Sequence, residues 1–276
     1  MRDPRHILIT GASSGLGAAL AQVYARRGVG LALTGRDEQR LAAVAAHCRA
    51  AGSAVNTAVL DVCDRESLAA WIKATDDARP LDLVIANAGI SAKTGRGQGD
   101  EGGGSSFGLE SLELTRRILA TNLDGVLNTL EPVLPLMRQR RRGQVALMSS
   151  LVAFRGLPGF AAYCASKAAV KVYGEALRCE LLGRGVKVSV ICPGFVRTPM
   201  TDRNRFPMPF RVEPGLAAAI IRLGLAGDQA RICFPGAMAV LARLLAVLPP
   251  ALVDPVLAWA ARQESPRPVK RKPVAD

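Results

Sequence analysis

Tyr163 and Lys167 are the pair of side chains in this sequence best suited to acid–base chemistry. They are four residues apart in a helix-like segment, so a helix brings both to one face. An ammonium group beside a phenol favours the phenolate and lowers the phenol pKa from its ordinary value of about 10. The pair predicts a tyrosine that exchanges a proton near neutral pH, although an exposed aromatic–lysine pair without function has the same spacing.

Residues 10–17, Thr-Gly-Ala-Ser-Ser-Gly-Leu-Gly, join a strand-like run to a helix-like segment. Glycines at such a turn let backbone N–H groups at a helix N-terminus approach a pyrophosphate. The spacing G-x-x-x-G-x-G departs from the G-x-G-x-x-G fingerprint, and glycines also serve strand-to-helix turns for steric reasons alone. The position directly after the first strand favours a dinucleotide cofactor.

Arg36 follows the second strand-like run, which ends in Thr34-Gly35. An acidic residue near this position accepts hydrogen bonds from the adenosine ribose 2′-hydroxyl, whereas an arginine accommodates a 2′-phosphate. Arg36 therefore favours NADP(H) over NAD(H) by charge complementarity. Asp37 could also reach the ribose, but its place directly before a helix-like segment predicts an N-cap.

Short apolar runs alternate with helix-length segments along the chain. The strand-like runs, apolar on both faces, are 6–10, 30–34, 54–60, 81–87, 144–149, 186–192 and 230–234. The segments between them long enough for crossover helices are 16–27, 38–51, 65–75, 109–142, 161–184 and 213–224. This alternation predicts an α/β fold, a single domain with a doubly wound, Rossmann-like parallel sheet flanked by helices.

Two segments interrupt that alternation. Residues 91–106 are polar and rich in glycine, which predicts a surface loop or flap after the fourth strand. Residues 198–214 contain four prolines and no helical period, and they include Phe206, Met208 and Phe210. We expect this second segment to form a lid over an apolar substrate.

The sequence resembles the short-chain dehydrogenase/reductase family over about residues 5–200. The motifs that carry the resemblance occur in order, as Thr10 to Gly17, Asp61-Val62, Asn87-Ala88-Gly89, Asn122, Ser149-Ser150, Tyr163 to Lys167, and Pro193-Gly194-Phe195-Val196-Arg197-Thr198. The resemblance implies a seven-stranded sheet and an NADP(H)-dependent oxidoreductase that interconverts a ketone and a secondary alcohol. It also implies a homodimer or homotetramer.

The resemblance further implies four catalytic residues. Tyr163 would donate the proton to a carbonyl or accept it from an alcohol, and Lys167 would lower the pKa of Tyr163 and hold the nicotinamide ribose. Ser150, thirteen residues before Tyr163, would donate a hydrogen bond to the substrate oxygen as charge develops there. Asn122 would complete a proton relay through water near Lys167, the alternative being an amide that satisfies its own helix backbone.

Cofactor contacts are implied for a larger set of residues. Those at the pyrophosphate and its ribose are Gly11, Ser13, Ser14, Gly15, Leu16 and Gly17, with Arg36 at the 2′-phosphate. Those at the adenine and adenosine-ribose side are Asp61, Val62, Asn87, Ala88 and Gly89. Those at the nicotinamide are Pro193, Gly194, Val196 and Thr198, together with Tyr163 and Lys167.

The end of the chain departs from the family pattern. We expect residues 1–236 to form the catalytic domain, 237–262 an apolar helical extension, and 263–276 a basic, disordered tail. Leu241, Leu244, Leu245 and Leu248 form a helical stripe. This stripe either packs back over the sheet or the substrate mouth, or it contacts anionic lipid together with the cations of the tail.

A net charge of +13 indicates an anionic partner, which could be nucleic acid, anionic lipid or an anionic cofactor. A charge-driven nucleic-acid binder is disfavoured, because aromatic residues make up only 4% of the chain and leave few stacking platforms. Four of the basic residues, Arg138, Arg140, Arg141 and Arg142, lie where a helix would end, which predicts a solvated helix terminus. A cofactor-binding regulator without turnover is the other alternative, and the complete catalytic set weighs against it.

The six cysteines are scattered and only two histidines occur, so we expect no metal site. Most of these cysteines lie in apolar runs, which predicts buried, reduced thiols. We expect Cys164 to be a packed helix residue rather than a reactive thiol. The first strand begins too early for a signal peptide and no apolar run reaches spanning length. We expect a cytoplasmic protein, at most peripheral to a membrane.

Overall fold

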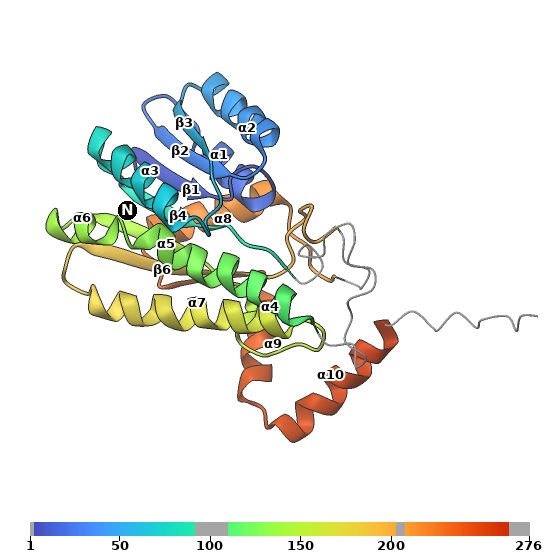
Figure 1. Ribbon diagram of the computed structural model, residues 1–276. Coiled ribbons are helices and arrows are strands. Elements are labelled where there is room, and N and C mark those ends of the chain that lie inside the picture. The colour runs from blue at the N-terminus through green and yellow to red at the C-terminus, as the bar shows by residue number, and fades with distance from the viewer. Residues whose placement is uncertain (1–2, 92–109, 203–207, 265–276) are drawn as a thin grey trace, which may run out of the picture.

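The computed structural model describes residues 3–91, 110–202 and 208–264, with side chains up to residue 260. Its centre is a seven-stranded parallel sheet in the order β3-β2-β1-β4-β5-β6-β7 (Figure 1). The strands are β1 His6–Thr10, β2 Gly30–Gly35, β3 Ala54–Val59, β4 Leu83–Ala86, β5 Gly143–Met148, β6 Val186–Pro193 and β7 Arg231–Phe234. The predicted doubly wound α/β fold is confirmed.

Helices cover both faces of the sheet because successive strand residues point to opposite sides. Ile7 and Ile9 of β1 belong to one apolar core and Leu8 to the other. The first core is closed by α1 Gly15–Tyr24, α2 Glu38–Ala50 and α8 Pro214–Ala226. The second is closed by α3 Arg65–Ala78, α5 Gly125–Leu130, α6 Leu134–Gln139 and α7 Ala161–Glu180.

The strand order reverses direction at β1. From β1 the chain proceeds outward to β2 and β3, and then returns to pair β4 on the other side of β1. In open parallel sheets, a crevice forms beyond the carboxyl ends of the strands at such a reversal. The turns after β1, β4, β5 and β6 therefore meet at one edge, and the candidate site lies there.

The third strand differs from expectation. Residues 54–60 were expected to be apolar on both faces, but β3 is the edge strand and most of its side chains are exposed or half-buried. Its sequence, Ala-Val-Asn-Thr-Ala-Val, contains two polar residues, which an edge position tolerates because a single neighbouring strand and helix cover it. The prediction of a fully buried strand was wrong here.

The prediction of one long helix over 109–142 is also wrong, because the segment is broken into several shorter helices. The described part contains α4 Leu112–Leu119, a π-helical turn η2 Ala120–Asp124, then α5 and α6. Pro132 and Pro135 explain the later break, because proline cannot donate a backbone hydrogen bond within a helix. The π turn carries Asn122, and such turns occur often at functional sites.

The basic run 138–142 is a third correction. Arg140 donates to both carboxylate oxygens of Asp76, at 2.6 and 3.0 Å, and Arg142 pairs with Asp82 at 3.0 Å. The Asp76 side chain is only 6% exposed. Arg140 is therefore an ion-pair partner of a buried carboxylate that ties α6 to α3, and the solvated terminus describes only its neighbours Arg138 and Arg141.

Two helices follow the last strand, α9 Gly236–Val247 and α10 Pro250–Glu264. Both lie below α7 in the view of Figure 1. The leucine stripe stays largely outside the packing: Leu241, Leu244 and Leu248 are exposed, and Leu245 is half-buried. Gln263 and Glu264 belong to α10, and the remainder of the expected tail lies outside the described residues.

Several other predictions can be compared with the structure. The flap expected at 91–106 lies, apart from Ser91, outside the described residues, as does Phe206 of the expected lid, while Phe210 is exposed. Cys48, Cys164 and Cys192 are buried as expected, but Cys63 and Cys179 are exposed. Within the described ranges, no helix is long and apolar enough to cross a membrane, and no cluster of potential metal ligands is found.

Candidate active site

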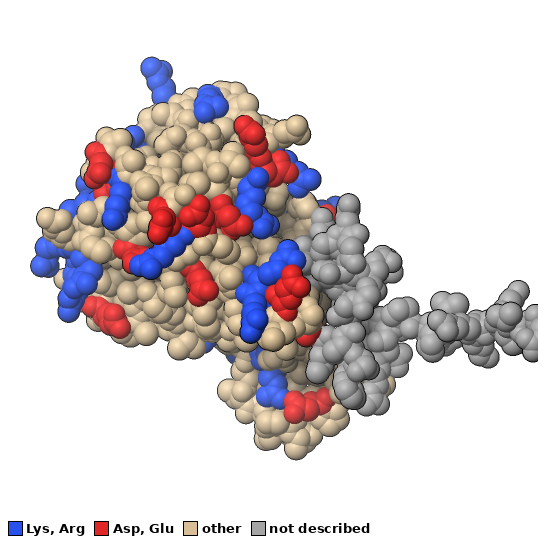
Figure 2. Space-filling view, viewed as in Figure 1, with Lys and Arg blue, Asp and Glu red and all other residues tan. Residues whose placement is uncertain are grey.

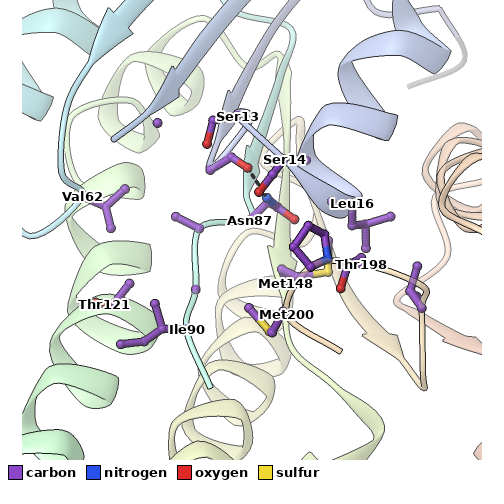
Figure 3. A pocket seen from close by; sticks show the side chains of 18 of the residues that line it. Ser13, Ser14, Leu16, Val62, Asn87, Ile90, Thr121, Met148, Thr198 and Met200 are labelled. Atoms are coloured by element: carbon purple, nitrogen blue, oxygen red, sulfur yellow. Dashed lines mark hydrogen bonds between the residues drawn. The ribbon is translucent and has the colours of Figure 1, made fainter. Parts of the chain in front are cut away.

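A cavity of about 430 Å³ occupies the crevice at the carboxyl ends of the strands (Figure 3). Every residue predicted to bind cofactor or to act in catalysis lines it, except Asn122. Its residues come from the turns after β1, β2, β3, β4, β5 and β6 and from the start of α7. The structure thus brings together residues that are up to 190 positions apart along the chain.

The turn after β1 forms a cradle that leaves no room for a side chain at Gly11 or Gly17. A Cβ atom at Gly17 would lie 2.2 Å from the carbonyl oxygen of Gly11, and one at Gly11 would lie 2.7 Å from the Cα of Ala88. Gly11 and Gly15 also have positive φ values, +66° and +56°, which glycine adopts without strain. The backbone of this turn leads directly into the N-terminus of α1, which fits a negatively charged pyrophosphate.

Asn87 holds the central turns in register. Its side-chain Nδ2 donates to the carbonyls of Thr10 at 2.9 Å and Gly11 at 3.2 Å. In return, the Thr10 hydroxyl oxygen accepts from the backbone N–H groups of Asn87 and Ala88. Figure 3 shows Asn87 beside the Ser13–Ser14 turn. This geometry is that of the expected brace between β1 and β4.

Two arginines line the end of the cavity beside β2. Arg36 pairs with Asp61 at 3.5 Å, and both side chains are well exposed. Burial raises the pKa of Asp61, but hydrogen bonds from Cys63 and the charge of Arg36 together lower it by more, so the pKa lies below its ordinary value. Asp37 caps α2, as predicted, by accepting from the N–H of Arg40 at 2.9 Å. Arg40, whose Nε also pairs with Asp37 at 3.2 Å, lines the cavity and was not predicted from the sequence.

Lys167 is buried and donates from Nζ to the carbonyl of Met148 at 2.9 Å. Burial lowers its pKa to about 8. Its Nζ lies 5.8 Å from the centre of the Tyr163 ring. Burial raises the pKa of Tyr163 to about 12, against a lowering by a hydrogen bond with Ser150. Burial is the larger of these two effects, so the pKa of Tyr163 lies above its ordinary value of about 10 in the structure. The lowering of this pKa by Lys167, expected from the spacing, stays a prediction.

Ser150 lies at the end of β5, next to the cavity. Its hydroxyl donates to the carbonyl of Pro193 at 3.3 Å and accepts from the N–H of Val152 at 3.3 Å. The neighbouring Ser149 hydroxyl donates to the carbonyl of Lys167 at 2.7 Å, which fastens α7 to β5. Of the two serines, Ser150 is the one whose hydrogen bond lowers the pKa of Tyr163.

Asn122 lies beside the cavity, behind its wall. It is fully buried, accepts from the N–H of Ile90 at 2.8 Å and donates to the Ile90 carbonyl at 2.9 Å and to Ser166 Oγ at 3.0 Å. These bonds hold the segment after β4 against α7, rather than satisfying the amide within its own helix. Its role in a proton relay stays a prediction.

Further cavity residues were not predicted from the sequence: Gly35, Asp37 as a lining residue, Arg40, Leu60, Ile90, Thr121, Met148, Pro199, Met200 and Thr201. Arg40 could have been found, since it follows the predicted N-cap Asp37 by one helical turn. Thr201 makes several hydrogen bonds to Thr198, and its hydroxyl also donates to the carbonyl of Val196, so the 198–201 segment forms its own turn. Burial raises the pKa of the Cys164 thiol, which agrees with its predicted packing role.

A sheet that places a dinucleotide cradle beside a serine, a tyrosine and a buried lysine defines an NAD(P)-dependent oxidoreductase. A family model described as short chain dehydrogenase matches residues 5–207. The chain belongs to the short-chain dehydrogenase/reductase family.

The similarity extends to individual proteins. The chain is 42% identical over 251 residues to an uncharacterized oxidoreductase of Myxococcus xanthus, covering 91% of this chain and 95% of that protein. It is 33% identical over 205 residues to the ketoacyl reductase HetN of a Nostoc species, covering 74% and 68%. Among solved structures, levodione reductase superposes with a TM-score of 0.73 at 26% identity, over 86% of this chain and 98% of that one.

Proposed function

We propose that this protein is an NADP(H)-dependent oxidoreductase that interconverts an apolar ketone and a secondary alcohol. One observation carries the proposal: Ser150, Tyr163 and Lys167 line the same cavity as the glycine cradle of residues 11–17. A nicotinamide cofactor, when bound, supplies or accepts the hydride. Acid–base chemistry on the substrate oxygen is then left to the chain's own side chains.

The protonation state of Tyr163 suits the role of proton donor. A Tyr163 pKa of about 12 keeps the phenol protonated at neutral pH, ready to donate its proton to a carbonyl oxygen. Ser150 Oγ would donate a hydrogen bond to that same oxygen as negative charge develops on it. The Lys167 ammonium would stabilise the phenolate that remains, because an opposite charge nearby favours the ionised form.

Charge at the β2 end supports NADP(H). Arg36 and Arg40 both line the cavity, and each has a carboxylate nearby, Asp61 and Asp37 respectively. Exposed pairs of this kind contribute little to stability, so a 2′-phosphate can replace the carboxylate as partner at small expense. Two guanidinium groups at this end favour the phosphorylated cofactor.

Lining residues support an apolar substrate. Ile90, Met148, Pro199 and Met200 contribute apolar surface to the cavity, and Figure 3 shows Met148 and Met200 close to Thr198. Methionine adapts to ligands of varied shape because its side chain is unbranched and polarisable. The similarity to a ketoacyl reductase supports a carbonyl carried on an acyl-like chain. We further propose a homodimer or homotetramer, to be checked by sedimentation velocity.

The test is a screen of ketones graded in chain length, with NADPH oxidation as the readout. On a ketone that is turned over, Tyr163→Phe should lower kcat about 100-fold or more. Tyr173→Phe, on the same helix but away from the cavity, is the matched control and should keep the activity of the unmodified protein. Full turnover by the Tyr163→Phe variant would exclude the proposed proton transfer.

No observation favours the nucleic-acid binder considered from the charge. Several of the basic side chains are paired with carboxylates, as Arg65 is with Glu131 at 2.5 Å and Arg140 with Asp76 at 2.6 Å. A regulator without turnover would bind NADPH but oxidise it with none of the ketones, so the same screen distinguishes it from an enzyme.

A further inference from the structure

The helices that follow the sheet carry an exposed apolar surface. We define the C-terminal apolar surface as Val240, Leu241, Leu244 and Val247 of α9, Leu248 directly after it, and Leu252, Val256 and Trp259 of α10. These side chains are between 42% and 78% exposed. They make up eight of the sixteen large exposed apolar side chains in the described part of the chain. Such a concentration on two consecutive helices marks an interaction site.

Both helices are exposed on this surface although each also packs against the rest of the protein. On its other side, α9 packs through Met238, Ala239 and Ala242 against the cluster that contains Leu151 and Cys192. In α10, Val253 is 3% exposed. Each helix therefore uses one apolar face for the fold and presents a second apolar face outward, since Leu252, Val256 and Trp259 are spaced at i, i+4 and i+7.

Charge is sparse on this surface and basic at its end. Among the described side chains of residues 236–260, the only charged ones are Arg243 and Asp254, and Asp254 pairs with Arg155 of the body. Figure 2 shows the corresponding lower lobe as largely uncharged atoms. The sequence after α10 then adds Arg267, Lys270, Arg271 and Lys272 against one acidic residue, Asp276.

An apolar helical face that is followed along the chain by a cluster of cations complements an anionic lipid bilayer. Trp259 has an amphipathic ring of the kind that sits at the level of lipid headgroups. None of the described helices is long and apolar enough to cross a membrane. We propose that the C-terminal apolar surface docks this protein on anionic membranes, with α9 and α10 lying in the interface.

The proposed docking surface adjoins the active site. A Cβ atom at Gly194 would lie 3.2 Å from Met238 Sδ of α9 and 3.3 Å from Leu151 Cδ1, so α9 packs on two cavity-forming turns. A groove of about 740 Å³ separates α10 from the loop that follows Ser150. A bilayer bound here would lie beside that loop. The docking inference itself does not depend on the reaction proposed above.

The test is flotation of the full-length protein with lipid vesicles. One set contains phosphatidylcholine alone, and the other contains added phosphatidylglycerol. We expect flotation with the anionic set that weakens as salt is raised, because salt screens the tail cations. Combining Leu244→Glu, Val247→Glu and Trp259→Glu should weaken partition at least about tenfold. Charge reversal of Lys270, Arg271 and Lys272 should remove the preference for the anionic vesicles.

The matched control carries Val59→Glu, Leu112→Glu and Leu182→Glu, which place the same charges at exposed apolar positions elsewhere. It should float like the unmodified protein, and circular dichroism should show that all variants are folded. Absence of flotation by the unmodified protein overturns the proposal. So does equal loss in the control, or a α9–α10 variant that only changes the oligomeric state in sedimentation velocity, which would assign the surface to a second copy of this chain.

Discussion

The ammonium group of Lys167 donates a 2.9 Å hydrogen bond to the backbone carbonyl of Met148, the last residue of β5. The next residue, Ser149, donates from its hydroxyl to the carbonyl of Lys167 at 2.7 Å. The two bonds run in opposite directions between the same two elements. Together they fix the position of α7 along the end of β5. Tyr163, one helical turn before Lys167, is thereby placed in the cavity.

Burial of Lys167 makes the stability of the protein depend on pH. Its pKa of about 8 lies below the ordinary value of about 10.4, so between these pH values the unfolded chain binds more protons than the folded one. The free energy of unfolding should therefore rise with pH in this window, by up to about 3 kcal/mol. Tyr163, with its pKa raised to about 12, acts in the opposite sense only above about pH 10.

Urea unfolding between pH 7 and pH 10 measures this effect when the unmodified protein is compared with Lys167→Met. The variant lacks the titrating group, so the difference in unfolding free energy between the two proteins should change across the window in favour of the unmodified one. A difference that stays constant with pH would show that the ammonium is not desolvated as the structure indicates.

The two cavity arginines should discriminate between cofactors. Arg36→Ala and Arg40→Ala should each raise the Kd for NADPH about tenfold, the loss of one charge-assisted bond, and leave the Kd for NADH nearly unchanged. Fluorescence titration of both cofactors measures this. Arg49→Ala is the control, because Arg49 lies on the same helix and donates to the Val55 carbonyl, away from the cavity. Unchanged NADPH affinity in both cavity variants would refute the proposed phosphate site.

Asn122→Ala should destabilise the fold. The substitution leaves the buried N–H and carbonyl of Ile90 without their partner, so we expect a loss of about 3 kcal/mol in unfolding free energy. Asn128→Ala is the comparison, since its side chain makes a single bond to the Val62 carbonyl and should lose about 1 kcal/mol. Chemical denaturation ranks the two variants, and equal losses would mean that the Ile90 bonds contribute nothing special.

Arg140→Ala should be more destabilising than a surface arginine substitution. It leaves the buried carboxylate of Asp76 with only the N–H of Leu81 as partner, at 2.7 Å, and should lower the unfolding free energy by about 3 kcal/mol. Arg138→Ala, two residues earlier and exposed, should stay within about 0.5 kcal/mol of the unmodified protein. Thermal unfolding of the two variants side by side decides whether the ion pair is structural.

Much of the active site could be predicted because of how a parallel sheet is built. Residues that follow the strands, such as Gly11, Asn87, Ser150 and Pro193, must meet at one edge when all strands run in the same direction. Strand and helix periods, and the order of motifs along the chain, are local properties. They determined the fold class, the cradle, the Tyr163–Lys167 face and the Asp37 cap.

What the tertiary structure decided are the pairings and exposures that no local pattern contains. Asn122 bonds to Ile90 and Arg140 to Asp76, 32 and 64 residues away, because packing brings their elements together. β3 is exposed because it became an edge, and Tyr163 has a raised pKa because burial outweighs the hydrogen bond with Ser150. The outward apolar face of α9 and α10 was also decided by the tertiary structure. The periodicity of the sequence predicts an apolar stripe, but only the packing of the surrounding elements determines whether that stripe is buried or exposed.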